Sequence, residues 1–172
     1  MATYKKGFKK ENPETVLLKV IIGIIIVVFV MVGVLFVYDA TTKWKDYDYF
    51  TTVETYTGIF EYTNGGDEAL EDYVIYLYSS NESSTSIKTD VLKDGKVINK
   101  DSEMFFLANS DAMTDTDTAL DDFLATIDQE ELSTPMIIVV ANGEFYDAYV
   151  GSADLLATLN SIEAGTFDAF NE

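Results

Sequence analysis

The sequence lacks three residue types on which much enzyme chemistry depends: its 172 residues include no cysteine, no histidine and no arginine. Without a thiol or an imidazole there is no disulfide, no cysteine nucleophile, no cysteine or histidine zinc site and no histidine general base. Hydrolases of the Ser-His-Asp and Cys-His types are therefore excluded. Basic residues are also scarce, because 11 lysines face 30 acidic residues, for a net charge of −19. Since nucleic-acid affinity depends on clustered basic residues, we predict no nucleic-acid partner.

One stretch of the chain lacks charge altogether. Residues 20–38 read VIIGIIIVVFVMVGVLFVY, and at about 1.5 Å per residue they span roughly 28 Å, close to the hydrocarbon thickness of a bilayer. Together with the residues just before it, this run predicts a single transmembrane helix over residues 16–38. A cleaved signal peptide is one alternative, but it has a shorter apolar core and small residues at its cleavage site. A buried core helix is the other, and it is rarely apolar on every face.

The distribution of lysines predicts the orientation of this helix. Five lysines precede or enter the apolar run, whereas only Lys43 and Lys45 follow it closely. The positive-inside rule then places the N-terminus in the cytoplasm and the remainder outside the cell membrane. Residues 39–172 hold six lysines and 28 acidic residues, a net charge of −22. We therefore expect a strongly acidic extracytoplasmic domain.

These observations predict five segments along the chain. They are a cytoplasmic N-terminal segment at 1–15, a transmembrane helix at 16–38, a juxtamembrane spacer at 39–50, an extracytoplasmic domain at 51–164 and an acidic tail at 165–172.

Within the outer domain, apolar runs alternate with amphipathic ones. Continuous β-branched and aromatic runs predict buried strands, and apolar residues at helical spacing predict helices. The predicted strands are 73–78, 104–108, 135–141 and 144–150, and the predicted helices are 87–98, 117–127 and one that starts at Ser152. The polar residues 79–86 predict a loop, Asn64-Gly65-Gly66 a turn and Asn142-Gly143 a hairpin. Residues 51–62 fit either a strand or a short helix. The order predicts an α/β fold, with one mixed sheet and helices on both faces.

The C-terminal half carries a family resemblance. The run Ser133-Thr134-Pro135 is followed by an apolar strand, an Asn142-Gly143 turn, a strand that ends at Val150-Gly151 and a last helix. This order resembles the thioredoxin-like family, and the resemblance covers residues 70–164. The resemblance implies a cis peptide bond before Pro135. Where that family has Cys-x-x-Cys, this chain has Glu82-Ser83-Ser84-Thr85. Thiol–disulfide exchange needs a thiolate, so the chain resembles a membrane-anchored member of the family without its redox activity.

The resemblance also implies a surface for extended polypeptides. In this family the backbone of the residue before the cis-proline can pair with a peptide strand. The candidate peptide-binding surface comprises Glu82, Ser83, Ser84, Thr85, Thr134 and Pro135. We predict no catalytic residue, no metal ligand and no cofactor. The expected function is a protein-binding or structural module at the outer face of the membrane, with an envelope or exported protein as its partner.

Other functions remain open at the level of sequence. Five aspartates between 111 and 122 suggest a divalent cation, which prefers oxygen ligands, although an EF-hand template fails on its required glycine. The alternative function is therefore an acidic ligand- or cation-binding domain or a non-thiol enzyme. A third is a vestigial homologue that retains only the fold. Asn81-Glu82-Ser83 is also a glycosylation sequon.

Overall fold

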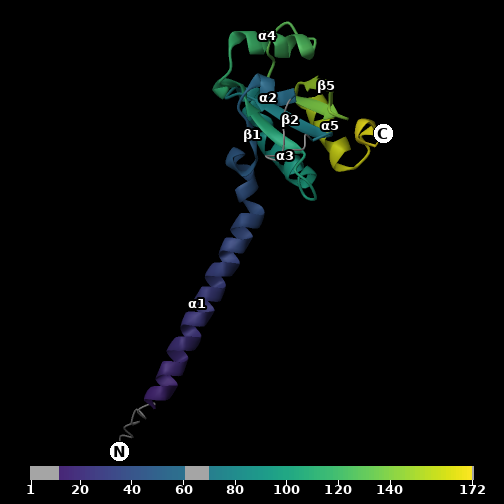
Figure 1. Cartoon of the computed structure of the whole chain (residues 1–172). Helices are drawn as coiled ribbons and strands as arrows, with labels where there is room; N and C mark the ends of the chain where they lie inside the picture. Colours follow the sequence, from purple (N-terminus) through teal and green to yellow (C-terminus); the bar gives the residue numbers. More distant parts are fainter. Residues whose placement is uncertain (1–11, 61–69, 172) are drawn as a thin grey trace, which may run out of the picture. The chain divides into compact units, whose positions relative to one another are not determined.

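The computed structural model describes residues 12–60 and 70–171, and the chain divides into two compact units at Thr42. The first unit is built around helix α1 (Pro13–Thr41), 29 residues long (Figure 1). Asn12 caps it, because its side chain accepts a hydrogen bond from the Glu14 N–H, and Pro13 takes the first position, where no donor is lost. None of its side chains is buried, and the helix is long and apolar enough to cross a membrane. A signal sequence would meet the same criterion.

The second unit contains a five-stranded sheet in the order β1-β3-β2-β4-β5. Its strands are β1 (Thr52–Val53), β2 (Tyr73–Tyr78), β3 (Phe105–Asn109), β4 (Met136–Ala141) and β5 (Glu144–Val150). Strands β1, β3 and β2 run parallel, whereas β4 and β5 pair antiparallel. Its α-helices are α2 (Tyr56–Phe60), α3 (Glu82–Ile98), α4 (Asp117–Thr126) and α5 (Ser152–Glu163). The fold is thioredoxin-like, as the sequence predicts.

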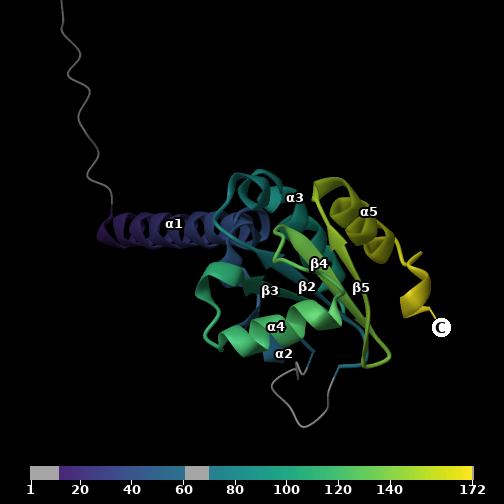
Figure 2. The same ribbon diagram turned by 90° about the horizontal axis from the view of Figure 1, so that it is seen from above.

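The core lies on both faces of the central strands. Every residue of β2 and β4 is buried, which explains their continuous apolar sequences. Because side chains alternate along a strand, Val74 and Tyr76 pack with α3 and α5, while Ile75 and Leu77 pack on the opposite side with α2 and α4. Figure 2 shows these helix pairs on opposite sides of the sheet. The predicted mixed sheet with helices on both faces is confirmed.

The hairpin between β4 and β5 also follows its sequence. Asn142 and Gly143 adopt φ angles of 54° and 75°, the left-handed conformations that a two-residue turn of this kind requires. Gly151 has a φ of 89° and precedes the first residue of α5. A side chain is strained in that conformation, so glycine is the favoured residue where β5 ends.

Two parts of the predicted secondary structure need correction or completion. Residues 82–86 are not a loop, because α3 begins at Glu82 and Asn81 is its N-cap. The ambiguous segment 51–62 supplies both kinds of element, since strand β1 is followed directly by helix α2. The turn expected at 64–66 lies outside the described residues.

Residues 43–50 belong to the second unit. They form two 3₁₀ turns, η1 (Lys43–Lys45) and η2 (Tyr47–Tyr49), followed by Phe50, which is only 6% exposed. The Tyr47 ring stacks on Tyr78 with 3.9 Å between centroids. The segment expected as a spacer therefore contributes aromatic side chains to the core cluster shared with α3 and α5.

The end of the chain packs on the same cluster. A short turn, η4 (Asp168–Phe170), follows Phe167, and the rings of Phe167 and Phe170 lie 5.3 Å apart in an edge-to-face arrangement. Both rings contact the core cluster on the side of α3 and α5.

Candidate functional site

Three loops meet at one edge of the sheet. The pairing of Tyr78 with Asn109 brings the carboxyl ends of β2 and β3 side by side. The pairing of Leu77 with Met136 brings the start of β4 to the same edge, since β4 runs antiparallel to β2. In open α/β sheets, ligands bind outside the carboxyl ends of the parallel strands. The loops that follow β2 and β3 and precede β4 thus form the candidate site.

Asn81 connects the first turn of α3 to the loop before β4. Its side-chain oxygen accepts the Ser84 N–H at 2.8 Å, which caps the helix. Its side-chain nitrogen donates to the Thr134 hydroxyl oxygen at 2.7 Å and to the Thr134 carbonyl at 3.3 Å. The Ser79 hydroxyl lies 2.9 Å from the Thr134 hydroxyl. These bonds join residues that are 53 or 55 positions apart in the sequence.

A second set of bonds joins the loops after β2 and β3. One carboxylate oxygen of Asp111 accepts both the N–H and the hydroxyl of Ser80, each at 2.8 Å. These hydrogen bonds hold the pKa of Asp111 below its ordinary value, because they favour the charged form. The Ser110 hydroxyl donates to the Tyr78 carbonyl at 3.1 Å. The edge is therefore a connected polar network.

The six predicted surface residues separate into two groups. Glu82, Ser83 and Thr85 are exposed on the first turn of α3, and Thr134 is half-buried. Ser84 is 0% exposed and Pro135 is also buried, so neither side chain is available to a ligand. The expectation that these two side chains form part of the surface is corrected: they support it from below.

Ser84 shows how this support is built. Its hydroxyl oxygen accepts the Ser79 N–H at 3.3 Å, and its carbonyl accepts the Tyr76 hydroxyl at 3.3 Å. Burial is the largest of the effects that raise the pKa of Tyr76 far above its ordinary value, so this hydroxyl stays a neutral donor. The first turn of α3 is thereby fixed to the strand beneath it.

Thr134 presents backbone groups beside this turn. The Thr134–Pro135 peptide bond is cis, as the resemblance implies. Within residues 12–60 and 70–171, the Thr134 N–H has no hydrogen-bond partner. Its carbonyl accepts only the 3.3 Å bond from Asn81 among the described residues. Both groups are therefore suited to pairing with an extended chain.

Sequence reasoning missed Asn81, Ser79 and Asp111 as parts of this site. The N-cap spacing from Asn81 to Ser84 is a local signal that the sequence does contain. The bond from Asn81 to Thr134 has no such signal, because it depends on the strand pairing that brings the two loops together.

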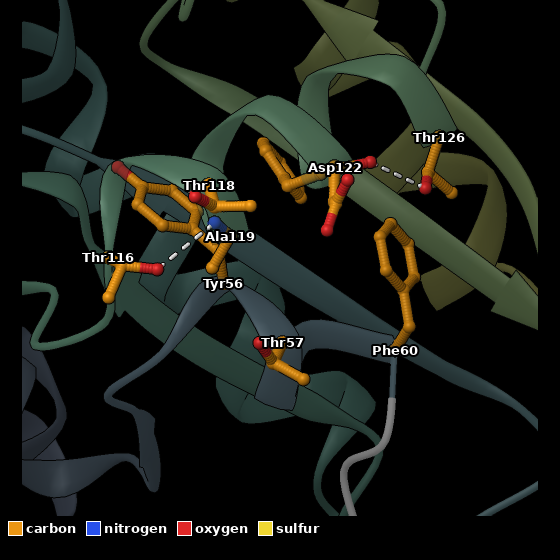
Figure 3. A pocket seen from close by; sticks show the side chains of 9 residues that line it. Tyr56, Thr57, Phe60, Thr116, Thr118, Ala119, Asp122 and Thr126 are labelled. Atoms are coloured by element: carbon orange, nitrogen blue, oxygen red, sulfur yellow. Dashed lines mark hydrogen bonds between the residues drawn. The ribbon is translucent and has the colours of Figure 1, made fainter.

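A separate pocket of about 330 Å³ lies between α2 and α4. Figure 3 shows the side chains of Tyr56 and Phe60 from α2 facing the polar residues of α4. Two of its threonines bond to α4: Thr116 accepts the Ala119 N–H at 3.4 Å, and the Thr126 hydroxyl donates to the Asp122 carbonyl at 2.8 Å. These two hydroxyl groups thus cap and support α4.

The aspartates between 111 and 122 do not converge. Asp111 bonds to Ser80, and Asp115 accepts the Thr57 N–H at 3.1 Å, while the remaining three are exposed on α4. Across the described residues, no group of three or more acidic side chains has the arrangement of a metal site. No geometry in this part of the chain therefore points to a bound cation.

No family model and no curated protein matches this sequence. Solved structures do match it, among them mitochondrial thioredoxin 3 from Saccharomyces cerevisiae in its oxidized form, 15% identical with a TM-score of 0.46. This match covers 71% of the present chain and 97% of the yeast chain. A chain from the yeast mitochondrial 1-Cys peroxiredoxin thiol-resolving system is 16% identical over the same shares, with a TM-score of 0.43. Thioredoxin from Malassezia sympodialis is 18% identical over 66% of this chain and 90% of its own, with a TM-score of 0.40.

The resemblance stops at the fold. At these identities and scores the matches carry no inference about activity, and the thioredoxin-like description rests on strand order and connections. The first turn of α3 holds Glu82 to Thr85, and the chain contains no cysteine. Thiol–disulfide exchange therefore has no nucleophile in this chain.

Proposed function

We propose that this chain is a single-pass membrane protein whose redox-inactive thioredoxin-like domain binds an extended segment of an envelope or exported protein. The observation that carries the proposal is the pair of Thr134 backbone groups. The N–H has no partner within the described residues, and the carbonyl accepts only one long bond. Exposed side chains of Glu82, Ser83 and Thr85 lie on the turn that Asn81 connects to them.

Binding would use backbone pairing for affinity and the α3 turn for selectivity. An extended peptide that runs antiparallel to residues 133–134 would accept from the Thr134 N–H and donate to its carbonyl. The Asn81 amide keeps its 2.7 Å bond to the Thr134 hydroxyl while the longer 3.3 Å bond is exchanged. Glu82 adds a negative charge beside the peptide. The anchor would keep the domain close to its partner and raise the effective concentration of the domain.

In-cell photo-crosslinking tests the binding proposal. A photo-crosslinking residue at Thr85 is compared with one at Thr126, an exposed position on α4. We expect a discrete crosslinked protein from Thr85 and none from Thr126. Equal products from both positions, or none from Thr85, would contradict a binding role for this surface.

Cysteine accessibility tests the anchor and its orientation. Because the chain has no cysteine, Ala2→Cys and Thr126→Cys each introduce its only thiol. In intact cells, a membrane-impermeant maleimide should label Thr126→Cys and should label Ala2→Cys only after lysis. The opposite pattern would reverse the orientation, and recovery of the protein without the membrane fraction would contradict the anchor.

A further inference from the structure

All cationic side chains of the acidic domain come from two short segments. The six lysines of residues 39–172 are Lys43, Lys45, Lys88, Lys93, Lys96 and Lys100. The structure brings the two segments together, since η1 packs on α3. The Lys96 ammonium lies 5.6 Å from the centroid of the Trp44 ring. The Lys88 ammonium lies 4.1 Å from the Tyr47 ring and 3.8 Å from an Asp46 carboxylate oxygen. We call the six lysines together with Trp44 the basic surface.

Charge is also segregated around α3 itself. At about 100° per residue, Lys88, Lys96 and Lys93 fall within roughly 140° of the helix circumference. Asp90 and Asp94 lie on the other flank, and Asp94 experiences the charge of Glu163 on α5. From Lys88 onward, the helix therefore presents lysines on the side of η1 and Asp90 and Asp94 on the side of α5, while Glu82 in the first turn falls within the lysine arc.

The basic surface begins next to the apolar helix in the chain. Lys43 is two residues beyond Thr41, the last residue of α1, and Trp44 follows it. Tryptophan and lysine are the side chains that favour the headgroup region, where an amphipathic ring or a long aliphatic stem ends in a polar group. Lys43, Lys45, Lys93 and Lys100 are exposed, and Lys88 and Lys96 are half-buried against the aromatic rings.

The remaining charges of the domain determine which face can approach an anionic bilayer. The 28 acidic residues outnumber the lysines, so the other faces would be repelled by negatively charged headgroups. Lysine clusters beside a membrane span attract anionic lipids, with a strength that decreases as salt screens the charges. Charge complementarity and continuity with α1 both favour the lipid surface as the occupant.

We infer that the basic surface lies against the anionic phospholipid headgroups of the membrane that α1 crosses. The inference rests on the proposed membrane anchor. In this orientation the η1 side of α3 faces the bilayer, and the side of the sheet that carries α2 and α4 faces the aqueous phase.

The test uses the full chain in lipid nanodiscs. Thr89 is exposed on the lysine flank of α3, and Thr126 is exposed on α4, so a nitroxide is attached to Thr89→Cys or, as the control, to Thr126→Cys. The measurement is the relaxation of each nitroxide by a paramagnetic metal chelated to lipid headgroups. In nanodiscs that contain phosphatidylglycerol we expect several-fold stronger relaxation at residue 89 than at residue 126. The difference should shrink at high salt and in nanodiscs of phosphatidylcholine alone.

A charge variant assigns the effect to the lysines. In the Thr89→Cys chain, K93Q/K96Q/K100Q should abolish the response to phosphatidylglycerol. The control A125E/T126E/A157E lowers the net charge by the same three units at exposed positions of α4 and α5, and it should leave the response in place. Equal relaxation of residues 89 and 126 in inserted chains, or a signal indifferent to phosphatidylglycerol, would overturn the inference alone. A chain that does not insert into the nanodisc would contradict the anchor and, with it, the inference.

Discussion

At the scale of single residues, Gly95 shows a helix position where packing outweighs helix propensity. A Cβ atom on Gly95 would overlap the ring of Phe105, which is fully buried in β3. Alanine normally stabilises a helix by about 1 kcal/mol relative to glycine, but overpacking a core typically costs about 1–3 kcal/mol. We expect Gly95→Ala to lower the free energy of unfolding by up to about 2 kcal/mol, measured by denaturant unfolding. In an F105L background, Gly95→Ala should cost less than it does in the wild-type chain, because the obstructing ring atoms are then absent. A stabilised Gly95→Ala chain would contradict this account.

The burial of Asp94 lowers the stability of the domain by an amount that can be measured. Asp94 is 5% exposed, and burial, with a smaller contribution from Glu163, raises the pKa of Asp94 to about 6. The native chain therefore binds more protons than the unfolded chain between about pH 4 and pH 6, and stability falls as the pH rises through this range. We expect Asp94→Asn to stabilise the protein by about 1–2 kcal/mol at pH 7.

The stabilisation should become small below pH 4, where Asp94 is mostly protonated in both states. Asp90→Asn, an exposed change on the same helix, serves as the control and should have a much smaller effect. Urea unfolding of both variants at pH 7 and pH 3.5 shows whether the gain in stability depends on the charge of Asp94. A gain for Asp94→Asn that is equal at both pH values would show that charge burial is not its cause.

At the scale of elements, the N-terminus of α3 depends on one side chain with two roles. Asn81 caps the helix through its oxygen and holds Thr134 through its nitrogen. Asn81→Asp keeps the cap but loses the donor, and we expect a loss of about 1 kcal/mol. Asn81→Ala loses both roles and should cost about 2 kcal/mol.

A double-mutant cycle with Thr134→Val identifies the second role. The cycle between Asn81→Ala and Thr134→Val should give a coupling energy of about 0.5 kcal/mol or more, since neither change leaves a hydrogen-bonding group in place of the one it removes. Strict additivity of the two free-energy changes would contradict a link between α3 and the loop before β4.

The juxtamembrane turns form the other element with a measurable contribution. Phe50 is buried, and Tyr47 stacks on Tyr78. We expect a chain of residues 43–172 to unfold cooperatively, and a chain of residues 51–172 to be less stable by about 3 kcal/mol. A chain of residues 39–172 provides the control and should match 43–172. Equal stability of the 43–172 and 51–172 chains would show that the two turns only border the domain.

The elements that the sequence predicts well are those with strong local signals. The strand predicted at 73–78 has the same bounds as β2, and the hairpin turn predicted at Asn142-Gly143 lies at those two residues. The start of α3 is missed because serine and asparagine favour both loops and helix caps. The docking of residues 43–50 is missed because Trp44 and its neighbouring tyrosines equally suit a membrane interface. The Asn81–Thr134 bond depends on strand pairing, which no local pattern encodes.

At the scale of the whole molecule, charge is divided between surfaces. All lysines of the second unit lie on the basic surface, so the candidate peptide site at Thr134 has carboxylates as its nearest charges, among them Glu82 and Asp111. A segment that pairs with Thr134 therefore approaches through a negative potential. Such a field accelerates the association of a cationic partner and slows that of an anionic one.

We therefore expect a lysine-rich extended peptide to associate faster than its glutamine-substituted analogue. The full chain is held in phosphatidylcholine nanodiscs, so that anionic lipid does not compete for the peptide, and stopped-flow fluorescence follows binding. The rate advantage should fall as salt is raised to about 0.1 M and beyond, where the Debye length is about 10 Å or less. Glu82→Gln should reduce the advantage more than Glu144→Gln, because Glu82 lies on the candidate surface whereas Glu144 is exposed beside the hairpin at the opposite end of β4. An association rate that does not change with salt would show that the negative potential has no part in partner selection, whatever the peptide contacts at Thr134.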